Sequence, residues 1–530
     1  MKKLYLFAVM VFVAMQVKAQ NDIANLDTYI GAQLTTEDLN GTARYVGMGG
    51  AMEALGADIS TIGSNPAGLG LFRSNQVSGS FGLVMQSDAK SFNNGSKTNA
   101  SFDQLGIVLA TRSGMHSYLN FGFNYHKNRN FNQILQAIDQ SIDGSSQNRQ
   151  TTIKAIRGDL DTKYGESQVD YLLYSFLIGG PDDVIYTYDS KDYRFNRAQT
   201  GYIGEFDFNL STNLNNRVYL GLTIGLKDVH YNSYTEYNET LESFDTDQFP
   251  ITMKDDHRIT GEGFDFKAGV IVRPVEESPF RIGVSVASPT FYKLTTNNHT
   301  VVDDQYGWVG YDDAETDFRF YTPWKFGISV GHTVGNYLAL GASYEYTDYS
   351  TNDMRIITSK SYNYWDGFYY EHSKSDPVMK RHAENTLRGV SLLKLGAEYK
   401  PAPNMSVRLG YNYVSPMYKE DGVRDQTLDS PGTYMASTTD YTNWKDTHRL
   451  TAGIGYSIDN FRIDLAYQYS MRKGDFYPYM HRDPDHAGQP FSAQYIDFDT
   501  GELSTLANQC RPVNVKDNRH QLLCTMTYSF

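Results

Sequence analysis

The feature that most constrains the fold of this 530-residue chain is a recurring alternation of apolar and polar residues. The clearest stretch places apolar residues at every second position, namely Val218, Leu220, Leu222, Ile224 and Leu226. Because successive side chains on a strand point to opposite faces, each such stretch predicts a strand with one apolar and one polar face. A soluble sandwich and a closed membrane barrel both satisfy this pattern, so the ends of the chain decide between them.

The N-terminus has the features of a cleavable export signal. Lys2 and Lys3 precede an apolar run from Leu4 to Val17, and Val17-Lys18-Ala19 provides small residues where a signal peptidase cuts. We therefore predict a signal peptide over residues 1–19, with the mature chain starting at Gln20. The run is too short for a retained anchor, and no later stretch is long enough for a transmembrane helix.

The C-terminus is aromatic, because the chain ends in Tyr528-Ser529-Phe530. With the export signal, this ending favours a barrel in the outer membrane of a Gram-negative cell, apolar toward lipid and polar toward the lumen. The expected contacts are outer-membrane lipid, lipopolysaccharide and the barrel-assembly machinery, which would recognise Phe530.

The alternation predicts an all-β, antiparallel transmembrane barrel of about 14 strands over residues 76–530. Short and long connections alternate along it, so we expect short periplasmic turns, long extracellular loops and both ends of the mature chain on the periplasmic side. An even number of strands closes the sheet without a free edge. The predicted strands are 76–86, 101–111, 116–127, 200–211, 216–230, 258–273, 279–288, 317–330, 336–349, 390–400, 405–414, 446–457, 460–470 and 520–530.

Composition agrees with this class and excludes nucleic acid as a partner. The 41 tyrosines suit a membrane boundary, and the 45 glycines suit turns and crowded lumen positions. The formal charge of −14 would become −17 once Lys2, Lys3 and Lys18 left with the signal peptide, whereas phosphate binding needs a basic face. The two cysteines, Cys510 and Cys524, leave a disulfide open.

Residues 20–75 precede the first strand and are rich in small residues, including Gly47-Met48-Gly49-Gly50-Ala51 and Asn65-Pro66-Ala67. This pattern resembles the FadL-type outer-membrane transport proteins, a family that includes TodX-like channels. The resemblance implies a hatch inside a fourteen-stranded barrel, with its motif at Asn65, Pro66 and Ala67 after Gly49 and Gly50. The residues alone also fit a tight turn that leads into the first strand.

The longest connection, 128–199, is expected to hold two amphipathic helices on the outer face. Ile134, Leu135 and Ile138 are spaced as one helical face, and a second apolar group follows at Leu172, Leu173, Phe176 and Leu177. These residues either pack against one another or form a hydrophobic ligand groove. The family resemblance implies the groove, because FadL-type proteins use loop helices in this way.

The function predicted from these features is passive uptake of hydrophobic small molecules, either long-chain fatty acid-like or aromatic. No nucleotide-binding string of the Gly-x-x-x-x-Gly-Lys-Ser/Thr type occurs, so no ATP-driven step is expected. The alternative is a haem receptor or a docking barrel of a secretion machine, with no transport of fatty acids. We expect no cofactor, since haem ligation would need an exposed His or Tyr that nothing singles out.

Catalytic and metal sites are not predicted. Four histidines lie near strands, but none has a Ser or Asp partner that the sequence identifies, so an outer-membrane protease or lipid hydrolase is the weaker hypothesis. The run His481-Arg482-Asp483-Pro484-Asp485-His486 matches no standard metal spacing and is interpreted as a solvated loop. The four histidines are His116, His126, His448 and His520.

Several charges should face the lumen, where they form either ion pairs with the hatch or a selective pore lining. Arg44, Glu53 and Asp58 of the hatch are candidates for such pairs. The inward charges are Asp265, Lys267, Arg281, Lys394, Glu398, Arg408, Arg449, Arg462 and Asp464.

Overall fold

The computed structural model describes residues 26–530 except 140–144, 163–164, 176–186, 243–247, 305–308, 366, 425–439, 484–485, 487 and 497–500. The predicted signal peptide, residues 1–19, lies outside the described residues. No helix in the described ranges combines the length and apolar character needed to cross a membrane.

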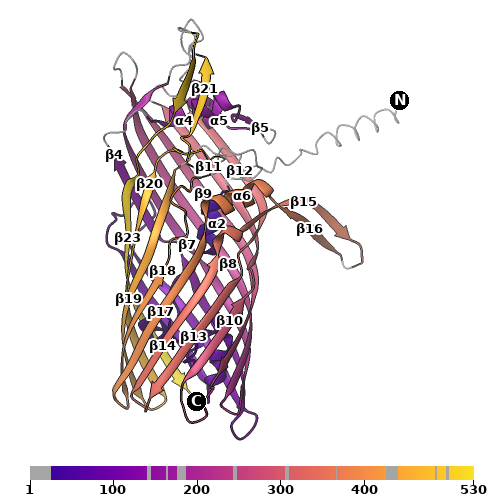
Figure 1. Ribbon diagram of the computed structural model, residues 1–530, viewed down its shortest axis with the longest axis vertical. Helices are drawn as coiled ribbons and strands as arrows, with labels where there is room; N and C mark the ends of the chain where they lie inside the picture. The colour runs from indigo at the N-terminus through magenta and orange to yellow at the C-terminus, as the bar shows by residue number, and fades with distance from the viewer. Residues whose placement is uncertain are drawn as a thin grey trace.

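Antiparallel strands wrap into a closed barrel that forms the body of the molecule (Figure 1). The ring closes because the first strand pairs with the last, from Gln76↔Ser529 to Gln86↔Arg519. Fourteen strands of the described chain make this ring, which confirms the predicted barrel. In order they are β1 (Gln76–Gln86), β2 (Thr98–Arg112), β3 (Tyr118–Asn130), β7 (Asp189–Leu214), β8 (Val218–Glu242), β9 (Gln248–Val272), β10 (Arg281–Ala287), β13 (Lys325–Val334), β14 (Leu338–Asp348), β17 (Gly389–Ala402), β18 (Met405–Val414), β19 (Tyr441–Ile458), β20 (Phe461–Tyr477) and β23 (Val513–Ser529).

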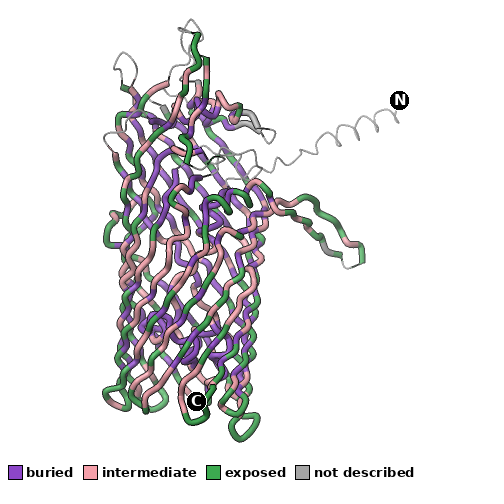
Figure 2. Tube along the Cα trace, in the orientation of Figure 1, coloured by how far each residue is buried: buried purple, intermediate pink, exposed green. Residues whose placement is uncertain are grey.

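The outer surface of the lower barrel is an apolar band. On β8 the side chains of Leu220, Leu222, Ile224 and Leu226 are exposed, whereas the intervening residues are buried. Such a band is what a transmembrane barrel presents to lipid, and it places the chain in an outer membrane. The alternation of buried and exposed residues is visible along the strands in Figure 2.

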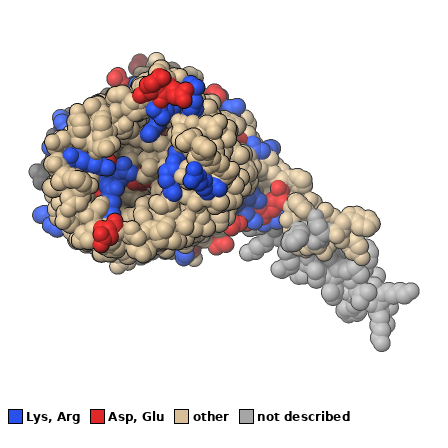
Figure 3. All heavy atoms as spheres, turned by 90° about the horizontal axis from the view of Figure 1, so that it is seen from below, with Lys and Arg blue, Asp and Glu red and all other residues tan. Residues whose placement is uncertain are grey.

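Short turns and the C-terminus lie at one end of the barrel (Figure 1). Left-handed residues close three of these turns, with φ values of 52° at Asn215, 52° at Gly335 and 49° at Asp459. Phe530 is tied to this end by a hydrogen bond from its backbone N–H to the carbonyl of Asn75, at 3.0 Å. Seen from here, Lys and Arg side chains lie around the hollowed mouth of the barrel (Figure 3).

Several barrel strands continue well above the apolar band, where the two faces exchange their polarity. On β9, the outward residues Phe264 and Phe266 give way to the exposed Asp256 and Arg258. The inward residues change in the opposite sense, from Asp265 and Lys267 to Ile251, Met253 and Ile259. The upper barrel is therefore water-exposed outside and holds an aromatic and aliphatic core inside.

The prediction of one strand over 317–330 is wrong, because the chain breaks there at Thr322-Pro323-Trp324. Strand β12 (Val309–Tyr321) ends before this break and β13 starts after it. β12 pairs with β11 (Phe291–Asp304), a strand that the alternation did not predict. A further hairpin, β15 (Asp353–Asn363) and β16 (Phe368–Ser375), follows a short 3₁₀ helix, η3 (Tyr349–Thr351).

Residues 26–75, called the N-terminal segment below, lie inside the barrel along its length. Their helical elements are α2 (Thr28–Thr35), α3 (Ala43–Gly47), η1 (Ile59–Gly63) and η2 (Pro66–Leu71). Asp27 caps α2 and pairs with Arg424, which follows β18 on the side away from the short turns. The expectation that both ends lie on the periplasmic side is therefore wrong for the start of the described chain, since the segment descends the lumen before it joins β1.

The upper end carries α4 (Gln147–Arg157) and α5 (Gln168–Ser175), and α6 (Pro377–Thr386) lies lower, beside β15 (Figure 1). Short strands accompany them: β4 (Gln133–Asp139), β5 (Asp161–Thr162), β6 (Gly165–Glu166), β21 (Ser492–Ile496) and β22 (Leu503–Ala507). Side chains from α5, α6 and the strand tops pack with Tyr29 of α2 into one buried aromatic cluster. This cluster fills the upper lumen, as the segment fills the lower.

Candidate functional site

The Asn65-Pro66-Ala67 motif packs against neighbouring wall strands from β7 to β10. Asn65 is buried, and its Oδ1 accepts a hydrogen bond from the N–H of Ala67 at 3.1 Å, while Pro66 starts η2. A Cβ on Gly221 of β8 would lie 2.3 Å from the carbonyl carbon of Pro66, and one on Gly269 of β9 would lie 2.0 Å from Asn65 Oδ1. Only glycine at these wall positions admits the motif.

Gly49 and Gly50 of the segment fit another part of the wall, at β14 and β18, in the same way. Gly49 and Gly50 have φ values of +63° and +81°, which disfavour any residue with a Cβ. A Cβ on Gly410 of β18 would lie 2.2 Å from the Gly49 nitrogen, and one on Gly341 of β14 would lie 2.0 Å from the Ala51 carbonyl oxygen. The lower segment thus meets the wall backbone to backbone. The sequence signal that would have found this contact is a glycine at inward positions of successive strands.

Ion pairs join the segment to the wall, with partners that the sequence did not identify. Arg44 pairs with Glu398 at 3.1 Å, and Glu53 with Lys394 at 2.6 Å. Arg408 is shared by two wall carboxylates, Glu398 at 2.6 Å and Asp464 at 2.8 Å. Nearly all of the predicted inward charges are buried, and Arg281 and Arg462 are partly exposed toward the turns.

Higher up, two acidic residues of the segment meet wall cations. Glu37 pairs with Lys325 and lies 3.6 Å from Lys227, and Asp38 pairs with Arg129 at 2.7 Å. Burial would raise the pKa of Glu37, but the ammonium groups of Lys325 and Lys227 hold that pKa well below its usual range. Glu37 is therefore charged at neutral pH.

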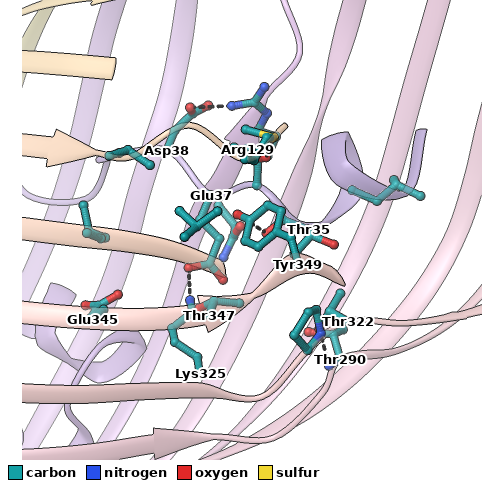
Figure 4. Close-up of a pocket in the computed structure, with 18 of the residues that line it drawn as sticks. Thr35, Glu37, Asp38, Arg129, Thr290, Thr322, Lys325, Glu345, Thr347 and Tyr349 are labelled. Carbon is teal, nitrogen blue, oxygen red and sulfur yellow. Dashed lines mark hydrogen bonds and ion pairs between the residues drawn. The ribbon is translucent and has the colours of Figure 1, made fainter. Parts of the chain in front are cut away.

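A cavity of about 120 Å³ lies between residues 34–38 of the segment and the wall (Figure 4). One side is apolar, with Leu34, Tyr349, Val390, Leu392 and Val414. The rest of the lining is charged, with three lysines beside Glu37, Asp265 and Glu345, and with Asp38 and Asp517 beside four arginines, Arg129, Arg449, Arg472 and Arg519.

The arginine side of the cavity has more cations than carboxylates. Asp517 accepts from Arg472 at 2.8 Å and from Arg519 at 2.9 Å, whereas Arg449 donates to the neutral amide oxygen of Asn412 at 2.7 Å. Arg472 also lies 4.1 Å from the ring centre of Trp444. Four guanidinium groups beside two carboxylates leave a local positive excess, which suits an anionic group.

The wall behind this cavity is interrupted in three successive strands, a feature called the wall break below. It comprises Ser288–Thr290 between β10 and β11, Thr322–Trp324 between β12 and β13, and Tyr349–Asn352 between β14 and β15. The ladder stops at Ala287↔Lys325 and resumes at Phe291↔Tyr321. Pro289 and Pro323 contribute no N–H to the ladder, which explains the interruption.

The wall break faces the cavity on one side and an apolar hollow on the other. Thr290, Thr322 and Pro323 line the cavity. Trp324, Val286 and Phe266 line the outer hollow, and Lys267 and Ser288 belong to both linings. At this point two residues border both the cavity and the lipid-facing hollow.

The proposed groove residues do not form one face. Residues 133–139 form β4 and not a helix, because they extend the barrel by pairing with β7 from Gln133↔Gln199 to Asp139↔Tyr193. Leu135 points into the buried aromatic cluster, Ile134 is covered and Ile138 is exposed. Helices do occur later in 128–199, where Leu173 of α5 joins that cluster and Leu172 packs against it. Phe176 and Leu177 lie outside the described residues.

Histidines and cysteines do not assemble into a reactive site in the described chain. His126 lies 3.3 Å from Asp207, and His448 contacts Asp446 at 3.0 Å and Tyr411 at 2.7 Å. No group of three or more potential metal ligands occurs among the described residues. His481 stacks on Tyr477 with ring centres 4.0 Å apart, and the two cysteines are free thiols.

Comparison with known proteins finds no matching family model and no similar curated protein. Solved structures do match. The toluene transporters TbuX of Ralstonia pickettii and TodX of Pseudomonas putida are 14% and 12% identical, with TM-scores of 0.45 and 0.46. In each comparison 93% of this chain and 99% of the other is covered.

A Pseudomonas aeruginosa FadL homologue is 13% identical, with a TM-score of 0.50, over 93% of this chain and 99% of the other. The chain has the FadL-type fold. This confirms the resemblance predicted from residues 20–75 and the strand count. At this identity the match establishes the architecture alone, and the solute has to be argued from the cavity.

Proposed function

We propose that this chain is a passive outer-membrane channel for hydrophobic small molecules, and not an enzyme, with the N-terminal segment as its hatch. The observation that carries the proposal is the cavity, because it lies between the segment and the wall break. Below it, glycine-to-backbone packing leaves the segment little room to move. A solute in the cavity therefore meets less protein toward the membrane than toward the periplasm.

The route we infer runs from the upper lumen to the cavity and then sideways through the wall break. Between Ser288–Thr290 and Thr322–Trp324 the ladder is reduced to one backbone hydrogen bond, from Thr322 N–H to the Thr290 carbonyl at 3.2 Å, and one bond to a side chain, from Thr290 N–H to Thr322 Oγ1 at 2.8 Å. Opening such a seam costs less than separating paired strands, since each lost hydrogen bond costs about 1 kcal/mol. The apolar outer hollow would then receive the solute.

The chemistry of the cavity favours an amphipathic acid over a neutral hydrocarbon. The arginine excess suits a carboxylate, and the apolar side suits the first methylenes of a chain, each worth about 0.8 kcal/mol when buried. At about 120 Å³, the cavity is smaller than the roughly 300–1,000 Å³ of sites that enclose a whole ligand, so the structure represents a closed state. Toluene, named for TbuX and TodX, carries no charged group that could pair with the excess of arginines.

A cross-link across the wall break tests the route. In a Cys510→Ser/Cys524→Ser background, Thr290→Cys/Thr322→Cys joins the two sides of the break, whose backbones are already hydrogen-bonded. Oxidation should abolish uptake of labelled long-chain fatty acid, and a reductant should restore it. Ser329→Cys/Ser343→Cys is the matched control, because these residues are partners in the continuous β13–β14 ladder. Equal uptake by both oxidised variants would refute the lateral route.

A solute comparison tests the substrate class separately. Cells that express the chain should take up a labelled long-chain fatty acid faster than cells lacking it, with little difference for toluene. Arg449→Gln should lower uptake of the acid alone, because Arg449 has no carboxylate within ion-pair distance in the described structure. No difference between cells with and without the gene, for either solute, would refute the transport function.

A further inference from the structure

The β15–β16 hairpin leaves the barrel and projects sideways from it (Figure 1). Only its root is joined to the wall, where β12 and β15 pair from Phe318↔Ile356 to Tyr321↔Asp353. Beyond that root, the two strands pair with each other as far as Asn363↔Phe368. The hairpin, called the arm below, therefore extends free of the barrel wall.

Ion pairs and hydrogen bonds at the root fix the direction of the arm. Arg355 donates to Asp353 at 2.8 Å, to the Ser373 carbonyl at 2.8 Å and to Ser375 at 2.9 Å. Glu371 accepts from Arg319 of β12 at 2.6 Å and pairs with Lys360 at 3.3 Å. Because this network holds the root, the arm projects in one direction and its tip has a defined position.

The tip of the arm is aromatic and exposed. The exposed fractions are 93% for Trp365, 85% for Tyr364, 74% for Tyr369 and 53% for Tyr362. The rings of Tyr362 and Tyr369 lie 4.9 Å apart and stiffen the end of the hairpin. A cluster of this size on a free surface marks an interaction site.

The position of the tip identifies what it contacts. The β12 side of the root ends at Tyr321, three residues before Trp324. Trp324, together with Tyr344 and Tyr346, forms the exposed aromatic border of the lipid-facing band on β13 and β14. From the root the arm leans toward the end with the short turns, that is, toward the level of this border (Figure 1). Tyrosine and tryptophan prefer this level, with the ring in the acyl boundary and the polar atom among headgroups.

We propose that the arm binds the surface of the outer leaflet beside the wall break. Its aromatic residues Tyr362, Tyr364, Trp365 and Tyr369 then lie in the headgroup layer. The partner is the lipid surface, because the arm starts beside the aromatic border of the band, carries exposed aromatic residues itself, and leans toward the lipid-facing part of the barrel (Figure 1). The arm begins at the upper edge of the wall break, where η3 leads into β15 and β12 pairs with β15. Membrane contact at the tip therefore holds the strands that frame the break.

A fluorescent label at the tip tests this placement. In the Cys510→Ser/Cys524→Ser background, Trp365→Cys carries a bimane label in vesicles that contain lipopolysaccharide. We expect strong quenching by lipids with a nitroxide headgroup and protection from iodide in water. Leu503→Cys is the matched control, because it is an apolar residue, 67% exposed, on the β21–β22 hairpin at the top of the molecule (Figure 1). Its label should respond to iodide only.

Three outcomes would overturn the proposal. One is a Trp365→Cys label that responds to iodide as the Leu503→Cys label does. Another is protection that appears only at high protein-to-lipid ratio, which would assign the tip to a second copy of this chain. The third is protection that persists in detergent only when another protein is added. Since the labelled residues are exposed, both variants should fold as the parent does, which heat-dependent gel mobility checks.

Discussion

Replacing Gly221 by alanine should loosen the N-terminal segment while leaving strand β8 intact. The added Cβ would lie 2.3 Å from the Pro66 carbonyl carbon and 2.4 Å from the Ala67 nitrogen, and neither backbone atom can rotate away. Forcing one extra carbon into a packed interior costs about 1–3 kcal/mol. Alanine offsets at most about 0.5–1 kcal/mol of this by favouring the strand over the unfolded chain. The substitution therefore destabilises the docked position of the N-terminal segment.

Converted to populations, about 1–3 kcal/mol is a 5- to 150-fold rise in the undocked fraction. Gly79→Ala is the control, since its Cβ would lie 3.7 Å from the nearest atom, the Leu105 side chain. Planar-bilayer recording should show more frequent open events for Gly221→Ala, and cells should become sensitive to hydrophilic antibiotics. Indistinguishable conductance for the two variants would refute the view that glycine packing closes the barrel.

Further predictions concern the buried charges and one thiol. Lys394→Met leaves the Glu53 carboxylate buried without its cation and should cost about 3–5 kcal/mol, whereas Lys360→Met on the exposed arm should cost about 0–1 kcal/mol; equal melting temperatures would contradict this. The pKa of Glu37 is depressed in the fold, so its stabilisation is full above about pH 4 and is lost as pH falls further. Conductance should thus be constant from pH 7 to 5 and rise only in stronger acid, and Glu37→Gln should remove that rise. Burial raises the pKa of the Cys510 thiol to about 12, so iodoacetamide at pH 8 should alkylate it slowly until urea unfolds the chain, as mass spectrometry would show.

The sequence predicted the strands where lipid dictates the pattern. Between Val218 and Leu226 every outward residue faces acyl chains, so the alternation is unbroken. Above the band, outward positions such as Arg258 face water and inward positions such as Met253 pack in a core. A search for strands with apolar residues on the outward face fails where the two faces exchange their polarity. For this reason β7, β8 and β9 were predicted too short. The hairpins β11–β12 and β15–β16 were missed for the same reason.

For the candidate site, local motifs were visible and long-range pairing was not. Asn65-Pro66-Ala67 stands out because proline and asparagine fix local backbone geometry. Which wall charge meets Glu53 depends on strand register and on the height of the segment, and neither is local. The wall break did leave a signal, since Pro323 stands in the middle of the predicted strand 317–330 and a proline argues against a paired central strand.

The two halves of the segment are held by different forces, and this difference decides which half can respond to a solute. Near the turns, backbone meets glycine backbone, so any movement must be large enough to clear hard contacts. At residues 34–38 the attachment is charge-based, through Glu37 to lysines and Asp38 to Arg129. A carboxylate in the cavity would compete with Asp38 for the guanidinium groups and weaken only this upper attachment. We therefore expect gating to be a local shift beside the wall break, with the glycine-packed lower segment staying in place.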